Sequence, residues 1–266
     1  MATGLPARAG LREWLSARLT AMRAGAAYRP PLPAELDAGV LGLEAVLAGA
    51  PADSLAALGF TVSSGVDETT GRPYTLVADE VDTERAWGAV VLPTGRPTLV
   101  IEVPHPRSDR RTARLGLELF HAVPGSALLV AGAHRTAGGG AADVAHRTDS
   151  MFHVWAGVLG TRAPEVQLHG YAAASLPAFD AVTSASGGVA TAAHVAARDA
   201  LAARGFRVCA GWWLGTCGRL EGTTNVQGIA AAGRGSPFLH LELAPGPRTD
   251  PAGRAAVVAA IAESWP

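Results

Sequence analysis

Apolar residues form their clearest run at Leu99–Val103, where the segment LVIEV holds a single polar residue. A short run of this kind, rich in β-branched residues and followed by prolines, is typical of a buried strand. Pro104 and Pro106 lack the amide hydrogen that a further ladder bond needs, so the strand must end before them. His105 is therefore predicted to lie at the carboxyl end of a strand, where open α/β sheets place their ligands.

The same pattern predicts strands and helices along the rest of the chain. An amphipathic helix over residues 10–24 and two shorter helices within 33–59 come before the first strand. The later alternation of strand and helix predicts an α/β fold, a three-layer α/β/α sandwich with a mixed, mainly parallel sheet of about eight strands. The predicted strands are 61–64, 74–78, 87–92, 98–103, 127–131, 166–168, 181–184, 207–211 and 238–243. One later helix is predicted to begin after Asp109 and to end at about residue 121. Three more are predicted over residues 142–159, 189–203 and 250–264.

Composition predicts one main domain and excludes several functions. The chain has 266 residues, 48% of them hydrophobic, which is enough for one sizeable core. We expect a helical segment at residues 1–60, packed on a single α/β domain at residues 61–266. The formal net charge of −1 provides no basic field for nucleic acid or anionic lipid. All 22 basic residues are arginine, which excludes lysine Schiff-base and P-loop chemistry.

The two cysteines, Cys209 and Cys217, are expected to be reduced thiols. A chain of this size has no need of a disulfide staple, and a single disulfide is the less favoured alternative. Residues 11–24 alternate charged and apolar groups at helical spacing, unlike a signal peptide, and no apolar run approaches the length of a membrane span. We therefore expect a cytoplasmic protein that does not cross a membrane.

Two histidines at strand ends suggest a metal site. His105 follows the strand at 98–103, and His169 ends the short apolar strand in VQLHGY. Asp109 lies one short loop after His105 and would complete a set of two nitrogens and one oxygen, which leaves the fourth position of a catalytic zinc ion open for water. Taken singly, His105 could be a loop imidazole bonded to the backbone. Asp109 could equally be a capping or first-turn residue of the next helix.

Glu242 is the candidate general base. In FLHLELAPGP it shares one face of a strand with Phe238 and His240, while three leucines occupy the other face. A carboxylate at the end of a buried strand, with no obvious cation in that strand, is costly unless it has a function or a hydrogen-bond network. Accepting a proton from a water molecule activated by zinc is such a function.

The order of these motifs resembles the zinc carboxypeptidase superfamily, nearest its compact poly-γ-glutamate hydrolase branch. The resemblance covers about residues 98–250, from His105 and Asp109 through QLHGY to FLHLELAPG. It implies hydrolysis of a peptide-like or γ-glutamyl amide. The zinc ion would be held by His105, Asp109 and His169, and Glu242 would be the base. Arg147, in DVAHR, partly matches the family's Asp-x-Asn-Arg element, and this implies a role in holding a substrate carboxylate or the oxyanion.

The chain also departs from that family. It has His-x-x-x-Asp where carboxypeptidases have His-x-x-Glu, so Asp109 is the least certain ligand, and Arg147 could instead be a surface arginine. Arg135 is the alternative to Arg147, and His134 ends a predicted strand and could line the cleft or replace a ligand. Asn225 lies in a predicted polar loop and could bind a substrate amide or simply make a turn.

The sequence therefore predicts a zinc-dependent hydrolase that cleaves an amide bond in a small-molecule or peptide-like substrate. Two alternatives remain open at this point. One is a non-catalytic protein of the same fold that binds a ligand or a partner. The other is a small-molecule deacylase of specialised metabolism.

Overall fold

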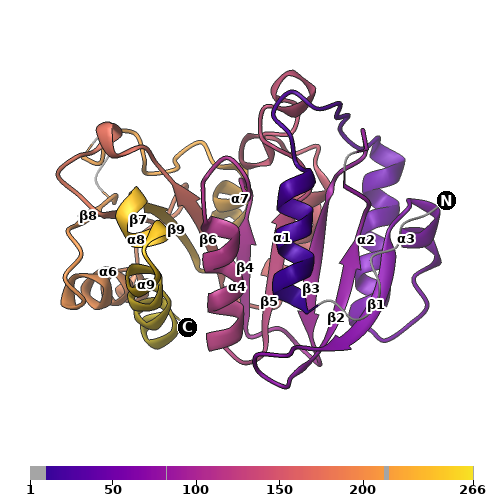
Figure 1. The fold of residues 1–266 in the computed structure, drawn as a ribbon, viewed down its shortest axis with the longest axis horizontal. Helices are drawn as coiled ribbons and strands as arrows, with labels where there is room; N and C mark the ends of the chain where they lie inside the picture. The colour runs from indigo at the N-terminus through magenta and orange to yellow at the C-terminus, as the bar shows by residue number, and fades with distance from the viewer. Residues whose placement is uncertain (1–9, 82, 213–215, 266) are drawn as a thin grey trace.

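The computed structural model describes residues 10–81, 83–212 and 216–265 and has the predicted α/β architecture (Figure 1). Within these residues, nine strands form one mixed sheet in the order β1-β2-β3-β5-β4-β6-β9-β7-β8. The strands are β1 Thr61–Val66, β2 Pro73–Ala78, β3 Gly88–Pro93, β4 Leu99–Val103, β5 Ser126–Ala131, β6 Glu165–Gly170, β7 Ala181–Ser184, β8 Val208–Ala210 and β9 Phe238–Leu243. The predicted three-layer fold class is confirmed.

The sheet is less parallel than predicted. Strands β1, β2, β3 and β5 pair antiparallel in that order, and β7 pairs antiparallel with β9. The parallel pairs are β4 with β5, β4 with β6, β6 with β9, and β7 with β8. Parallel pairing is therefore concentrated around β4, β6 and β9, and the carboxyl ends of these three strands point to the same edge.

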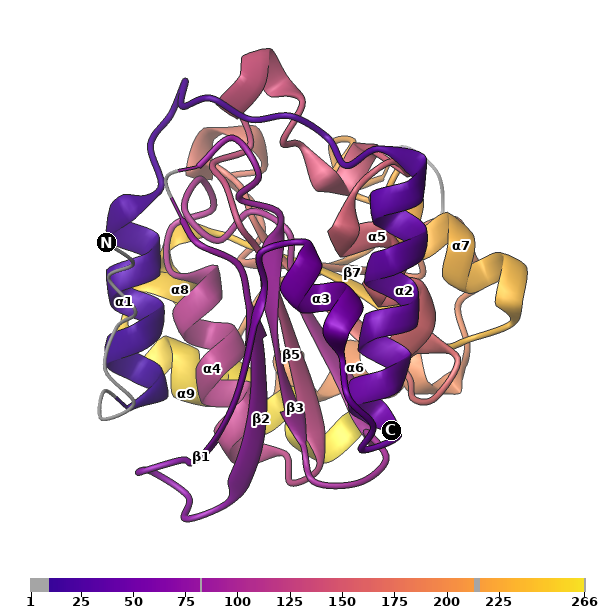
Figure 2. The ribbon, with the colours of Figure 1, turned by 90° about the vertical axis from the view of Figure 1, so that its right-hand side faces the viewer.

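Helices cover both faces of the sheet (Figure 2). On one face, α4 packs against α1 and α9, and α9 also contacts α6 and α8; on the other, α5 packs against α2 and α7, and α2 contacts α3. The helices are α1 Leu11–Ala21, α2 Pro33–Leu47, α3 Asp53–Ala57, α4 Thr112–Ala122, α5 Met151–Gly160, α6 Ala192–Ala203, α7 Val226–Arg234, α8 Pro245–Thr249 and α9 Pro251–Ser264. Short 3₁₀ turns occur at η1 Ala137–Gly140, η2 Val144–His146 and η3 Ala173–Ser175.

Successive side chains of a strand point to opposite faces of the sheet, so the interior consists of two apolar clusters, one on each face. In β4, Ile101 belongs to the cluster under α4 and α9, whereas Val100 belongs to the cluster under α2 and α5. Leu239, Leu241 and Leu243 of β9 all belong to the first cluster, as the period of two predicts.

The opposite face of β4, β6 and β9 is polar near their carboxyl ends. Because the strands are in register, Glu102 is opposite Gln167, Gln167 is opposite His240, and His169 is opposite Glu242. Polar side chains on three neighbouring strands are thus gathered on one face of the sheet, beneath α5 and α7.

Two helical predictions were wrong in detail. The helix predicted over 142–159 begins only at Met151, because the Ser150 side chain accepts a hydrogen bond from the His153 amide and caps it there. The predicted polar loop around Asn225 is instead the start of α7. Asn225 caps this helix by accepting from the Gly228 amide, and Gly235 ends it in a left-handed conformation.

The expectation of two reduced thiols was also wrong, because Cys209 and Cys217 form a disulfide. It links β8 to the segment that follows, where the Cys217 amide donates to the Glu221 carboxylate at 2.8 Å. Among the described residues, no helix combines the length and apolar character needed to cross a bilayer.

Candidate metal centre

The two predicted histidines meet at the carboxyl edge of neighbouring parallel strands. His105 lies in the loop after β4, and His169 is near the end of β6, which pairs directly with β4. Their ring centroids are 5.0 Å apart with the rings nearly perpendicular. Both imidazoles are buried, so neither is the solvent-facing loop residue that its sequence position alone would allow.

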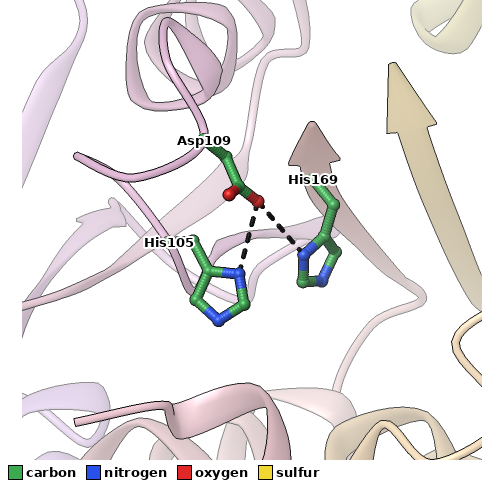
Figure 3. Close-up of side chains that lie close together, drawn as sticks. All are labelled: His105, Asp109 and His169. Atoms are coloured by element: carbon green, nitrogen blue, oxygen red, sulfur yellow. Dashed lines mark hydrogen bonds and ion pairs between the residues drawn. The ribbon is translucent and has the colours of Figure 1, made fainter. Parts of the chain in front are cut away.

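Asp109 points between the two imidazoles (Figure 3). Its Oδ2 atom is 3.3 Å from His105 Nδ1 and 3.4 Å from His169 Nδ1, and it also accepts a hydrogen bond from the Gly170 amide at 3.1 Å. Ligand atoms of the three residues all lie within 4.8 Å of one another. The carboxylate of Asp109 therefore faces the histidines, and α4 is not capped by a side-chain hydrogen bond.

Each imidazole is oriented through its other nitrogen. His105 Nε2 is 2.8 Å from Asp143 Oδ1, and His169 Nε2 is 2.6 Å from Gln167 Oε1. Carboxylate and amide oxygens only accept, so both Nε2 atoms carry the hydrogen in the neutral rings. The two Nδ1 atoms then face the Asp109 carboxylate, and with a metal ion in place of any proton between them the three groups offer one oxygen and two nitrogen ligands.

The three groups have different proton affinities. Burial alone would lower the pKa of His105, but hydrogen bonds to Asp109 and Asp143 outweigh it and raise that pKa above its usual value. For His169, burial prevails and lowers the pKa to about 4. Burial opposes ionisation of Asp109, yet the bonds to both histidines hold its pKa well below the usual range.

Glu242 lies beside this centre, on the strand next to His169. Its Oε1 atom is 3.8 Å from His240 Nε2, and its Oε2 atom has no hydrogen-bond partner among the described residues. His240 is only 3% exposed, its ring centroid is 4.6 Å from that of His169, and neither ring nitrogen has a partner within the described chain. Glu242 and His240 are thus polar groups available to a ligand.

A cavity of about 380 Å³ opens above these residues. Its described lining includes His105, His169, His240, Glu242, Arg135 and Asn225, together with residues 219–224. The Arg135 guanidinium is 2.6 Å from Asp143 Oδ2 and half exposed, so a cation borders the cavity on the His105 side.

Other predicted site residues lie elsewhere or have their groups engaged. Arg147 bonds to Asp149 at 2.9 Å, and it is not among the described residues that line the cavity. His134 bonds to Thr136 Oγ1 at 2.9 Å and is likewise not part of that lining. Asn225 does line the cavity, but its Oδ1 accepts from Gly228 and its Nδ2 donates to Gln167.

Sequence reasoning missed several residues that orient the centre. Gln167 is two positions before His169, hence on the same strand face, and this spacing could have identified it. Asp143 follows the glycine-rich turn at 137–140, and nothing in its local pattern points to His105. Glu102 was taken as part of an apolar strand, although its position on the polar face of β4 follows from the period of two.

Comparison with known proteins finds structural similarity only. No protein-family model matches the chain, and no curated protein sequence matches it. A bacteriophage poly-γ-glutamate hydrolase is 16% identical, over 66% of this chain and 86% of that one, with a TM-score of 0.46. YNDL in a zinc-free form is 15% identical, over 68% of this chain and 92% of that one, with a TM-score of 0.48.

A metallo-carboxypeptidase from Pseudomonas aeruginosa is 14% identical, over 77% of this chain and 64% of that one, with a TM-score of 0.43. The similar structures thus include a hydrolase and a metallo-enzyme of the kinds that the sequence motifs resemble. At these identities and TM-scores, the chemistry has to be argued from this chain's own residues.

Proposed function

We propose that this protein is a zinc-dependent hydrolase that cleaves an amide bond. The observation that supports this most strongly is the convergence of two imidazole Nδ1 atoms and the Asp109 carboxylate beside the unpartnered Oε2 atom of Glu242. A metal-binding set next to a free carboxylate at a cavity wall is the arrangement that metal-assisted hydrolysis requires.

His105, Asp109 and His169 would hold the metal ion through Nδ1, Oδ2 and Nδ1. Zinc suits this mixed nitrogen and oxygen set, and when bound it supplies Lewis acidity that makes water more acidic. The role of Asp143 and Gln167 is to hold both imidazoles in the tautomer with a free Nδ1 atom.

Glu242 is the proposed general base. Its carboxylate would accept a proton from the attacking water molecule as the new C–O bond forms at the carbonyl carbon. It would then donate that proton to the amide nitrogen as the C–N bond breaks, so the products are a carboxylic acid and an amine. The absence of a partner on Oε2, within the described chain, leaves that atom available for both transfers.

Arg135 is the proposed binding group for the oxyanion or for a substrate carboxylate. Its guanidinium borders the cavity, whereas Arg147, the first choice from sequence, is paired with Asp149. Arg135→Lys should raise KM or lower kcat without changing zinc content, because lysine cannot form the bidentate fork. Arg147→Lys is the matched control and should leave KM and kcat unchanged. If Arg147→Lys alters these constants and Arg135→Lys does not, the binding role belongs to Arg147.

The decisive experiment combines metal analysis with a panel of amides, including γ-glutamyl and short peptide substrates. Purified protein should contain about one zinc ion per chain. Glu242→Gln should lower turnover by ~10²–10⁴-fold while zinc content stays the same, because glutamine keeps the shape but cannot accept the proton. Glu263→Gln, at an exposed residue paired with Arg204, is the control.

Activity of the folded, zinc-loaded Glu242→Gln variant near that of the unchanged protein would exclude Glu242 as the base. Zinc binding without hydrolysis of any amide would instead favour a ligand-binding protein.

A further inference from the structure

We propose that helix α7 selects the tautomer of His169, through the side-chain amides of Asn225 and Gln167, and thereby sets how tightly the centre binds metal. The second part of this statement rests on the proposed function, whereas the first concerns the metal-free protein. The groups involved are buried: Gln167 is fully buried, and Asn225 and Gln227 are 2% and 1% exposed.

The starting point is the cap of α7, which fixes the orientation of the Asn225 amide. Asn225 Oδ1 accepts from the Gly228 amide at 3.0 Å. A backbone N–H can only donate, so the oxygen of Asn225 must face the helix and its Nδ2 must face away. Nδ2 is then the group that meets Gln167, and it donates to Gln167 Oε1.

Gln227, in the first turn of α7, fixes the same amide from its other end. Its Nε2 donates to the Val144 carbonyl oxygen at 2.9 Å, so its Oε1 is the atom turned towards Gln167. Gln167 Nε2 lies 3.3 Å from that oxygen and 2.7 Å from Glu102 Oε2, both of which accept. Two amides, each anchored independently on the backbone, therefore require the same orientation of Gln167.

This orientation of Gln167 determines which ring nitrogen of His169 carries the hydrogen. The group that Gln167 presents to His169 is Oε1, at 2.6 Å from Nε2, so Nε2 must carry the hydrogen. A flipped Gln167 would place its NH₂ group against Asn225 Nδ2 and against His169, and its oxygen against two acceptors. Burial makes such unmatched contacts costly, and the Nδ1 lone pair of His169 therefore stays directed at the metal centre.

The far end of α7 supports the same network. Arg234 pairs with Glu165 at 2.8 Å, and the buried Glu165 is an electrostatic neighbour of Glu102. Burial and the neighbouring Glu165 raise the pKa of Glu102, whose Oε2 accepts from the Gln167 side-chain amide at 2.7 Å. One helix thus contributes Asn225, Gln227 and Arg234 to the support of one imidazole.

The test is Asn225→Asp, which keeps the capping oxygen but replaces the Nδ2 donor with an oxygen. That oxygen repels Gln167 Oε1 and favours the flipped amide, which forces His169 towards the tautomer protonated at Nδ1. Imidazole ¹⁵N NMR of the metal-free protein should show the Nε2–H tautomer of His169 in the unchanged protein and its loss in the variant. The Kd for Zn²⁺, measured by chelator competition, should rise ~10–100-fold.

Asp250→Asn is the matched control. Asp250 caps α9 by accepting from the Gly253 amide at 2.7 Å, so the reverse isosteric exchange is made at a helix cap outside the network. It should change neither the tautomer nor the Kd. If Asn225→Asp does not fold, Gln167→Met replaces it; this variant removes the acceptor and should give a mixture of tautomers with weaker zinc binding.

The inference is overturned if His169 of the unchanged protein is protonated at Nδ1, or if the folded Asn225→Asp variant keeps both tautomer and Kd. A failure of the proposed function looks different. In that case the unchanged protein would not bind Zn²⁺, but the tautomer would still follow Asn225, which would support the control of His169 by α7.

Discussion

His105 and His169 present the same ring nitrogen to the centre, but different surroundings hold them. His105 is oriented by Asp143, a partly exposed carboxylate that also binds Arg135 at the cavity wall. His169 is oriented by Gln167, an uncharged amide whose hydrogen-bonding groups are all engaged in the interior. At His105 burial is outweighed by hydrogen bonds to Asp109 and Asp143, which raise its pKa, whereas at His169 burial prevails and lowers the pKa.

The comparison suggests a division of tasks. The His105 side borders the cavity and includes groups that a substrate or a change of pH can reach. The His169 side also lines the cavity, but the amide that orients His169, Gln167, is fully buried in the polar face of the sheet. Substitutions at the two histidines and at the residues that orient them would show whether the two sides differ in this way.

Removing either imidazole should abolish zinc binding. His105→Ala and His169→Ala each leave one nitrogen and one carboxylate, and a centre with three protein ligands cannot spare one of them. Elemental analysis of the purified variants should give zinc contents near zero. Full occupancy in one variant would show that this histidine is not a ligand.

Neutralising Asp143, the carboxylate that orients His105, should weaken metal binding without abolishing it. Asp143→Asn keeps an acceptor for Nε2 but removes the charge that makes the imidazole a better ligand, and we expect the Kd for Zn²⁺ to rise by roughly 10-fold. Chelator competition measures it. Asp149→Asn, at a carboxylate paired with Arg147, is the control. An unchanged Kd for Asp143→Asn would mean that the charge of Asp143 pairs with Arg135 but does not affect His105 as a metal ligand.

The two histidines should affect acid stability of the metal-free protein with opposite sign. Burial lowers the pKa of His169 from 6.5 to about 4, so between these values the unfolded chain binds a proton that the folded protein does not. The free energy of unfolding therefore falls as pH is lowered through this window. The pKa of His105 is raised, so its contribution is complete below 6.5 and is lost as pH rises through the folded value.

Thermal melts across this range, on the metal-free protein, separate the two contributions. His169→Gln should flatten the loss of stability on the acid side, and His105→Gln should flatten the loss on the neutral side. Identical pH profiles for the two variants would contradict the contrast between a charged and a neutral support.

The smallest effect is expected for Glu102→Gln. If Glu102 is protonated, glutamine reproduces it: the amide can donate to Glu165 and accept from Gln167, and Tm should stay nearly unchanged. Glu165→Gln is the informative counterpart, because it leaves the Arg234 charge unpaired and should lower Tm. A large loss of stability for Glu102→Gln would show that Glu102 is ionised.

The sequence predicted most of the fold and the strand-end positions of the candidate metal ligands because these signals are local. His105 and His169 each follow an apolar strand, and parallel strands bring their carboxyl ends together. Glu242 was identified from the period of two in β9. The proposed roles of these residues in chemistry remain predictions.

The residues that support the ligands could not be predicted in the same way. Helix α7 was missed because VQGIAAAGR is only nine residues long and contains two glycines, which have a low helix propensity. Its cap, Asn225, was therefore assigned to a loop, and the contact with Gln167 joins residues 58 positions apart. Arg147 was chosen because DVAHR partly matches a family motif, yet its guanidinium donates to Asp149, two residues away. Such partnerships depend on packing, which local pattern does not contain.

The arrangement of β4, β6 and β9 also has a kinetic consequence. His105 follows the fourth strand and Glu242 lies on the ninth, so the centre is complete only when segments far apart in sequence have paired in parallel. Long-range parallel pairing is slow because the entropy of closing large loops opposes it. Metal capture would therefore report a late step of folding, after the sheet has closed around its middle strands, and added zinc would trap finished molecules rather than guide the chain towards them.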